Sequence, residues 1–299
     1  MRFIKFGQIG ILLTGGAITS LFMIGLFVYF TFVASSPTLL PIVVETENFR
    51  IHSTDKDNAA KVASLAEDAL RRIKSEIFVN SPAITSKIDI FLWDTPAGFR
   101  NSVIAADISD TGVSRLFMAE DGTLRRRIDV RSTAAITSVI SHEIAHLLMG
   151  ELDINRWKKG KLSIPLAIHE GIAILAEGRC NDELLMRAGI NMACARKKTC
   201  ANTQNHISHF DKLMQESNYT RLANACDFYA ESYSLVEYLM RELKPEGLGK
   251  LLHYLENGET LDEAIQLTMG NASNNFKASF IHNWHAHAKR NTDALIAMH

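Results

Sequence analysis

The stretch SVISHEIAHLLMG, residues 138–150, decides the fold class because it sets two histidines and a glutamate in an apolar helical run. On a helix, His142 and His146 are four positions apart, so both imidazoles project from one side. Glu143 lies about 100° around the same helix, where it can hydrogen-bond a metal-bound water without ligating the metal. The spacing therefore predicts a metal site of the HExxH type.

The polar groups of this helix need partners. Its apolar neighbours would bury it on several sides, and buried polar groups are costly unless each one is hydrogen-bonded or bound to a metal. Chance alone gives an HExxH match in roughly one chain in a hundred of this size. The motif suggests a metal centre, and the rest of the sequence must supply the third ligand.

Glu170 is the expected third ligand. It lies in the apolar helical stretch SIPLAIHEGIAILAEG, residues 163–178, and follows His146 by 24 positions, which leaves room for a loop and a return helix. His169 is the alternative, but it points about 100° away on the same helix. Two histidines and one glutamate leave the fourth zinc position open to water. We therefore expect one Zn²⁺ per chain at His142, His146 and Glu170.

At these residues the sequence resembles the peptidase MA-like domains of the gluzincin metallopeptidases, which are often found in bacterial proteins. HEIAH at 142–146 is the first matching motif, and EGIA at 170–173, followed by EG at 177–178, is the second. YAES at 229–232 is similar to the helix that follows the glutamate in that family. The resemblance covers roughly residues 42–290 and implies a thermolysin-like catalytic domain.

The resemblance also implies roles. Glu143 would be the general base that activates the metal-bound water, and a tyrosine hydroxyl would donate to the oxyanion of the tetrahedral intermediate. Tyr229 matches the family position, with Tyr233 one turn further as the alternative. Ile174 occupies the position where thermolysin has an aspartate that partners a histidine ligand. Another group must therefore orient the imidazoles here.

The family pattern is also altered beside the third ligand. Family members and related aminopeptidases commonly have a tryptophan shortly before the glutamate and often an asparagine next to it. Here Ala167 and His169 occupy that neighbourhood. This departure puts the placement of the substrate in doubt.

The hydrophobic pattern predicts an α+β domain. Strand signals and one long helix precede Ser132, and helix signals follow it to the C-terminus. The first half is expected to be a small β-sheet plus that helix, and the second half is expected to be mostly α-helical. The expected elements of the first half are a strand within 42–53, a helix at 57–78, and strands at 87–93, 113–119 and 124–130.

A membrane anchor is expected near the N-terminus. No acidic or basic residue lies between Lys5 and Glu45, and residues 9–33 are long and apolar enough to cross a bilayer as one helix. A cleaved signal peptide ending near residues 33–35 is the alternative, but its apolar core would be shorter, about 7–15 residues. The expected division is a cytoplasmic N-terminus (1–8), the anchor (9–33), a linker (34–41), the peptidase domain (42–290) and a C-terminal tail (291–299).

The charges that flank the anchor predict its orientation. Arg2 and Lys5 precede it and Glu45 follows it, so the N-terminus is expected in the cytoplasm and the catalytic domain outside, facing the periplasm from a bacterial inner membrane. Thiols tend to oxidise there. Disulfides are therefore expected, with Cys194–Cys200 and Cys180–Cys226 as the preferred pairs.

Composition excludes some functions. The net charge is −1 and 47% of residues are hydrophobic, so no nucleic-acid partner is expected. His282, His285 and His287 are interpreted as surface residues of an amphipathic C-terminal helix without a function. Together the patterns predict a membrane-anchored zinc metallopeptidase that acts on a peptide or protein. A catalytically silent zinc-containing scaffold and a zinc hydrolase of a non-peptide amide are the alternatives, and the oligomeric state is left open.

Overall fold

The structure is a computed structural model that describes residues 40–79, 86–102, 111–132, 136–161, 163–178, 188, 210–215, 225–270 and 275–298. The predicted anchor at 9–33 lies outside these residues, as do the side chains of Cys180, Cys194, Cys200 and Cys226. The anchor and the disulfides therefore stay predictions. Within the described ranges, no helix combines the length and apolarity that a membrane crossing requires.

The N-terminal half is a mixed five-stranded sheet with the strand order β1-β2-β3-β5-β4. The strands β1 and β2 form an antiparallel hairpin, β3 runs parallel to both β2 and β5, and β4 is the antiparallel edge strand beside β5. The strand bounds are β1 Ile42–Glu45, β2 Phe49–Ser53, β3 Ile88–Trp93, β4 Gly112–Met118 and β5 Leu124–Arg131.

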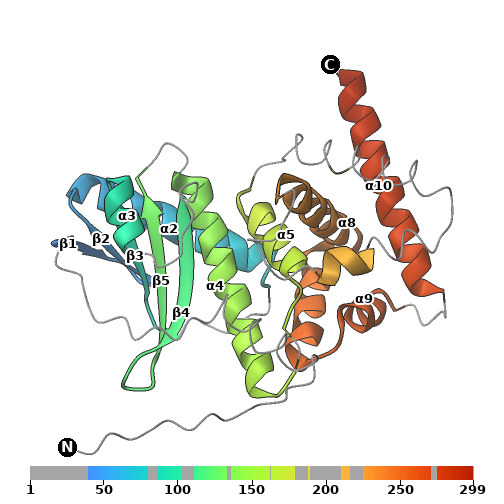
Figure 1. Ribbon diagram of the computed structural model, residues 1–299, viewed down its shortest axis with the longest axis horizontal. Coiled ribbons are helices and arrows are strands. Elements are labelled where there is room, and N and C mark those ends of the chain that lie inside the picture. Colours follow the sequence, from blue (N-terminus) through green and yellow to red (C-terminus); the bar gives the residue numbers. More distant parts are fainter. Residues whose placement is uncertain are drawn as a thin grey trace, which may run out of the picture.

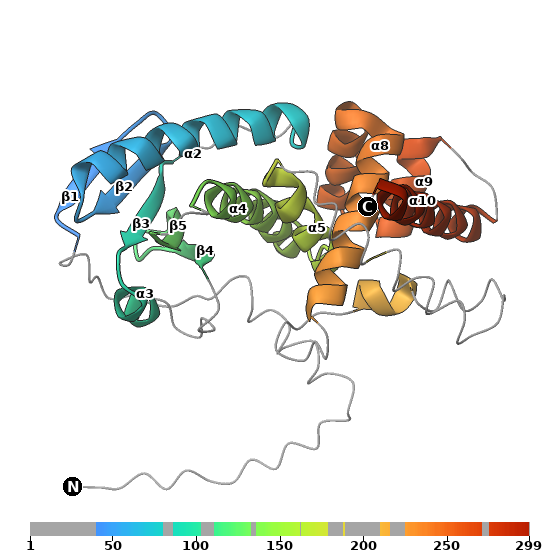
Figure 2. The same ribbon diagram turned by 90° about the horizontal axis from the view of Figure 1, so that it is seen from above.

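Helices lie on both faces of this sheet (Figure 2), α2 (Lys56–Glu76) on one and the short α3 (Pro96–Ser102) on the other. The Asp55 carboxylate caps α2 by accepting two backbone N–H groups of its first turn. The central strand β3 is buried at every position except Asp89, as expected of a strand that lies between two layers. Its Ile90 packs in the main core with α2, and its Phe91 packs with α3.

The C-terminal half is helical (Figure 1), so the predicted α+β class is confirmed. The helix α4 packs against the sheet, α5 packs on α4, and α8 packs on α5. A capping box of Thr260 and Glu263 starts α9, and Gly270 ends it with a φ of 66°. The helix bounds are α4 Ile136–Lys158, α5 Leu166–Ala176, α8 Ala225–Asn257, α9 Leu261–Met269 and α10 Phe276–Met298.

Gly150 does not end the HExxH helix, which continues to Lys158. A Cβ atom at Gly150 would lie 2.7 Å from Cδ1 of Leu116 on β4. The glycine therefore serves close packing between α4 and the edge strand. The real break in the helical half is in α8, where Lys244 has a φ of 59° and Pro245 starts a second helical segment.

The sequence pattern predicts that the three C-terminal histidines lie at the surface. This prediction is wrong for two of them. His282 is exposed, whereas His285 and His287 are buried. The Nε2 atom of His287 lies 2.5 Å from the carboxylate of Glu237, and its Nδ1 lies 3.1 Å from Nη1 of Arg241. Because an arginine can only donate, Nδ1 accepts and Nε2 donates. His287 thus joins α10 to α8, which explains how an imidazole is buried there.

Candidate metal centre

The helices α4 and α5 bring His142, His146 and Glu170 together. One possible ligand atom from each residue lies within 4.8 Å of the other two. The two Nε2 atoms are 3.1 Å apart, and the Glu170 oxygens lie 3.3 Å from Nε2 of His146 and 3.7 Å from Nε2 of His142. Glu170 is almost fully buried, at 2% exposure, while the two histidines are partly exposed.

These separations fit a metal ion. Zinc bonds of about 2.0–2.1 Å at tetrahedral angles place ligand atoms roughly 3.3–3.5 Å apart, close to the separations between these donors. A buried carboxylate beside two imidazole nitrogens also needs a positive charge to offset its burial. The donor set and its spacing therefore fit zinc in a site with three protein ligands.

His169, the alternative ligand, points away from this cluster. Its Nε2 lies 2.8 Å from a carboxylate oxygen of Asp153 on α4, and its side chain is 1% exposed. The second oxygen of Asp153 accepts the backbone N–H of Ile164. The Asp153–His169 pair fixes the start of α5 against α4 and leaves Glu170 to face the two histidines.

Glu177 is a site residue that the sequence assigned to no role. It stands at the end of α5 and lies 3.1 Å from Nδ1 of His142 through a carboxylate oxygen. It follows Glu170 by two helical turns, so both carboxylates face α4. A carboxylate on Nδ1 leaves Nε2 of His142 free for a metal. Glu177 is therefore placed to orient His142, which the apolar side chain of Ile174 cannot do.

Glu177→Gln is expected to weaken zinc binding by about 10- to 100-fold, because loss of an outer carboxylate makes the histidine a poorer and less well oriented ligand. Competition with a chelator of known affinity measures the change. Glu76→Gln is the matched control, since Glu76 is an exposed glutamate paired with Arg72. Equal zinc affinities for the wild type and Glu177→Gln would show that Glu177 does not support zinc binding.

The two histidines titrate differently. Burial alone would lower the pKa of His142, but the hydrogen bond to Glu177 and the charges of Glu170 and Glu143 together raise it to about 9. Burial and the neighbouring imidazoles lower the pKa of His146 well below its usual range. Near neutral pH, His142 is therefore protonated and His146 is neutral.

Zinc binding is expected to displace the proton from His142. Below a pKa of about 9 the metal competes with this proton, so zinc affinity should rise by up to about tenfold per pH unit between pH 7 and 9. Calorimetry in buffers of different ionisation enthalpy should count about one proton released per zinc near pH 7.5. A zinc affinity that stays constant over this range would contradict the protonation of His142.

Glu143 lies beside the cluster and is buried, at 7% exposure. Burial raises its pKa, helped by the charge of Glu170, against the charge of His142 and hydrogen bonds from Ser114 on the edge strand β4. A Cβ atom at Gly112 would lie 2.9 Å from a carboxylate oxygen of Glu143, so the glycine lets β4 approach. A raised pKa suits a group that takes a proton near neutral pH.

Gly171 sets how closely the third-ligand helix approaches its neighbour α8. A Cβ atom at this position would lie 2.3 Å from the backbone oxygen of Ser232 and 2.5 Å from Cγ2 of Val236. Only glycine fits this crossing of α5 and α8. The EG pair thus couples the candidate ligand Glu170 to the contact that holds its helix in place.

Both tyrosines of the YAES helix lie where α8 meets α5. Tyr233 is 2% exposed and is packed against Ile174, which is one turn after Glu170. Tyr229 is only partly buried and contacts the same cluster from its edge. The structure therefore places both near the third-ligand helix, and Tyr229 is the more accessible of the two. Its role as oxyanion donor stays a prediction.

Comparison with known families agrees with this geometry. The peptidase MA superfamily matches residues 65–286, which span most of the sheet, the metal cluster and the helical half. The chain therefore belongs to the peptidase MA superfamily, whose peptidases are typically metal-dependent. A search among curated proteins finds no significant match.

Proposed function

We propose that the chain is a zinc-dependent metallopeptidase that hydrolyses peptide bonds. The observation that carries the proposal is the convergence of two imidazole nitrogens and one buried carboxylate, with the Glu143 carboxylate next to them. Membership of the peptidase MA superfamily also supports a peptidase activity. We also propose that residues 9–33 anchor the domain in a bilayer, on the basis of their uncharged, apolar sequence.

In the proposed reaction, His142, His146 and Glu170 would hold a zinc ion, which would supply Lewis-acid polarisation and lower the pKa of a bound water molecule. Glu143 would accept a proton from the attacking water and pass it to the leaving amine, a role that its raised pKa favours. Glu177 keeps His142 in the tautomer that binds through Nε2. Tyr229 donates to the oxyanion from the neighbouring helix α8.

The edge strand β4 favours a peptide over other amides. Among the described residues, β5 is the only strand that pairs with β4, and Ser114 of β4 bonds Glu143 through both its side chain and its backbone. An extended peptide could add to this free edge by backbone hydrogen bonds, which would place its carbonyl groups beside Glu143. A small non-peptide amide would make no use of such an edge.

Two other functions remain as alternatives. A silent scaffold would have a closed zinc site with a fourth protein ligand, whereas three candidate ligands converge within the described part of the chain. A hydrolase of non-peptide amides would share the catalytic groups but would not need β4.

The test of the proposed function is hydrolysis of a peptide library and of small non-peptide amides, with and without a zinc chelator. We expect cleavage of peptides that chelation stops and zinc restores. Cleavage of small amides alone would favour the second alternative. A zinc-loaded chain that cleaves neither would favour the scaffold.

A further inference from the structure

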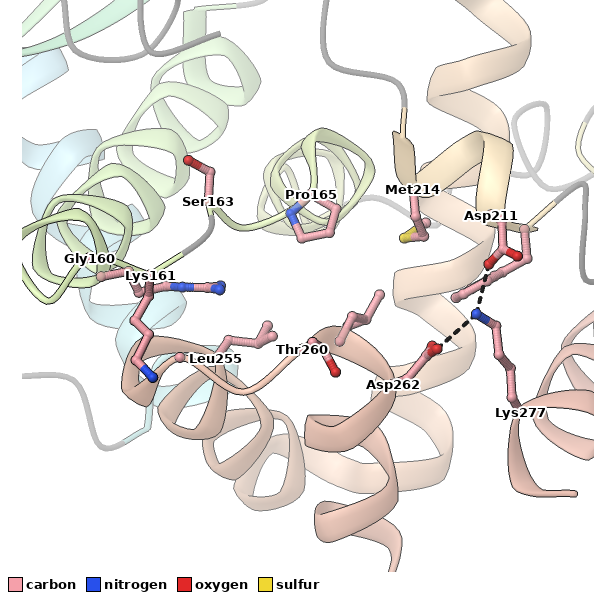
Figure 3. Close-up of a pocket in the computed structure, with 14 residues that line it drawn as sticks. Gly160, Lys161, Ser163, Pro165, Asp211, Met214, Leu255, Thr260, Asp262 and Lys277 are labelled. Atoms are coloured by element: carbon pink, nitrogen blue, oxygen red, sulfur yellow. Dashed lines mark hydrogen bonds and ion pairs between the residues drawn. The ribbon is translucent and has the colours of Figure 1, made fainter. Parts of the chain in front are cut away.

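A cavity lies between the end of α4 and the start of α5 (Figure 3). It has a volume of about 420 Å³ and is formed by the end of α4, the start of α5, the start of α9 and the segment 210–215. Figure 3 shows Ser163 and Pro165 on one side and Thr260 and Asp262 on the other. Nothing in the proposed peptidase mechanism uses this cavity.

Arg156 lines the cavity and is only 3% exposed. Its Nε and Nη1 atoms are buried and have no hydrogen-bond partner in the described ranges of the chain. Asp153, one turn earlier on α4, is already bonded to His169 and Ile164. Burial accordingly lowers the pKa of Arg156, although the charge of Asp153 opposes this. Buried guanidinium nitrogens without a hydrogen-bond partner are costly, so Nε and Nη1 of Arg156 call for an anion.

The start of α5 adds a second feature that favours an anion. The helix begins at Leu166 after Pro165, which makes no side-chain cap, and Pro165 lines the cavity. The first backbone amides of a helix carry partial positive charge and bind anionic groups. The guanidinium and this helix terminus therefore border one space.

The charge of the lining residues restricts the ligand to a single negative charge. Lys277 forms ion pairs with both Asp211 and Asp262, at 2.7 and 2.8 Å, and this group of three has a net charge of −1. The lining as a whole has three basic and two acidic side chains, so one positive charge is left over. A dianion such as hydrogen phosphate has two negative charges, of which the lining can balance only one. The second charge would be repelled by Asp211 and Asp262. The remaining wall includes the apolar side chains Phe210, Met214, Leu255 and Leu261.

We propose that this cavity binds a carboxylate that carries an apolar group, with the carboxylate on Arg156 and the apolar group against the far wall. The carboxylate could belong to a free acid or to the C-terminal residue of a peptide, because both offer the same chemistry. Arg156 follows His146 by ten positions, or about 15 Å along a helix. The site is therefore separate from the metal centre and does not depend on the proposed peptidase function.

The experiment measures binding to the whole chain carrying Glu143→Gln, so that no probe can be cleaved. The probes are N-acetyl-leucine, its neutral amide N-acetyl-leucinamide, a tripeptide acid ending in leucine, and inorganic phosphate. Calorimetry should detect the two carboxylates and neither the amide nor phosphate. Tighter binding of the tripeptide acid would show that the cavity takes the C-terminal carboxylate of a peptide. Tighter binding of N-acetyl-leucine would show that it takes a free acid.

Arg156→Met should weaken carboxylate binding by about 10- to 100-fold, the loss expected when charge-assisted hydrogen bonds are removed. The variant should fold at least as well, because it removes a buried unpaired charge. Arg156→Lys keeps the charge but loses the planar guanidinium, so its affinity for the carboxylate should lie between those of the parent chain and Arg156→Met. Arg71→Met is the control, since Arg71 is exposed and forms an ion pair with Asp68.

Three results would overturn the proposal. They are the absence of carboxylate binding to the parent chain, equal binding of the acid and its amide, and unchanged binding in Arg156→Met. Binding of phosphate alone would overturn the choice of a monoanion. None of these results bears on peptide hydrolysis, which is measured separately in the chain with Glu143 intact.

Discussion

Glu170→Gln is expected to lower the affinity of the chain for zinc by more than about 100-fold. The substitution keeps the size of the side chain but removes the one negative charge that faces both Nε2 atoms, at 3.3 and 3.7 Å. Loss of an outer partner costs about 10- to 100-fold, and loss of a direct anionic ligand should cost more. Zinc content after dialysis against a weak chelator measures the effect, and peptide hydrolysis should fall with it.

Glu67→Gln is the control for this change. Glu67 is a partly buried glutamate that accepts hydrogen bonds from Asn48 at the other end of the domain. Its substitution should affect the free energy of unfolding without changing zinc affinity. Full zinc retention by Glu170→Gln would show that Glu170 is not a ligand, and His169 would then have to leave Asp153 to take its place.

Gly171→Ala is expected to lower the free energy of unfolding by about 3 kcal/mol or more, at the upper end of overpacking costs. The added methyl group would meet the backbone of Ser232 at 2.3 Å, and a backbone cannot rotate away as a side chain can. Separating α5 from α8 should also move Glu170, so zinc affinity should fall too. Denaturant unfolding and zinc titration on the same sample measure both effects.

Gly150→Ala is the matched control. It is also a helical glycine, but its added methyl group would meet only the tip of Leu116, at 2.7 Å. That side chain can shift, and the gain in helix propensity of up to about 1 kcal/mol offsets the crowding. We expect a change of about 1 kcal/mol or less. Equal destabilisation by the two substitutions would contradict the special role of the α5–α8 crossing.

The metal cluster could be predicted from the sequence because its ligands follow from local periodicity. His142 and His146 share a helix face however the helix packs against the rest of the protein. Glu170 stands in an apolar stretch, where a buried carboxylate is costly unless it pairs with a positive charge or binds a metal. The choice between Glu170 and His169 rested on the same argument. The structure directs His169 to Asp153, a contact that depends on how two helices pack.

The remaining features depend on packing between segments distant in the sequence. Glu177 was recognised as part of a motif, but its contact with His142 requires α5 to lie along α4. The sequence pattern predicts a helix that ends at Gly150, because a glycine is typical of helix ends, whereas here the glycine permits close packing against Leu116 and the helix continues to Lys158. His287 looked like a surface residue because Glu237, its partner on α8, is 50 positions away. Arg156 carried no sequence signal at all.

The most direct test of the central claim compares the wild type with Glu143→Gln for zinc content and peptide hydrolysis. Glu143 lies beside the cluster and is not one of its ligand residues, so the variant should keep one zinc per chain. Loss of a general base should lower kcat by about 10²- to 10⁴-fold. We expect full zinc content with hydrolysis reduced by that factor. Unchanged turnover in a fully zinc-loaded Glu143→Gln chain would contradict the account.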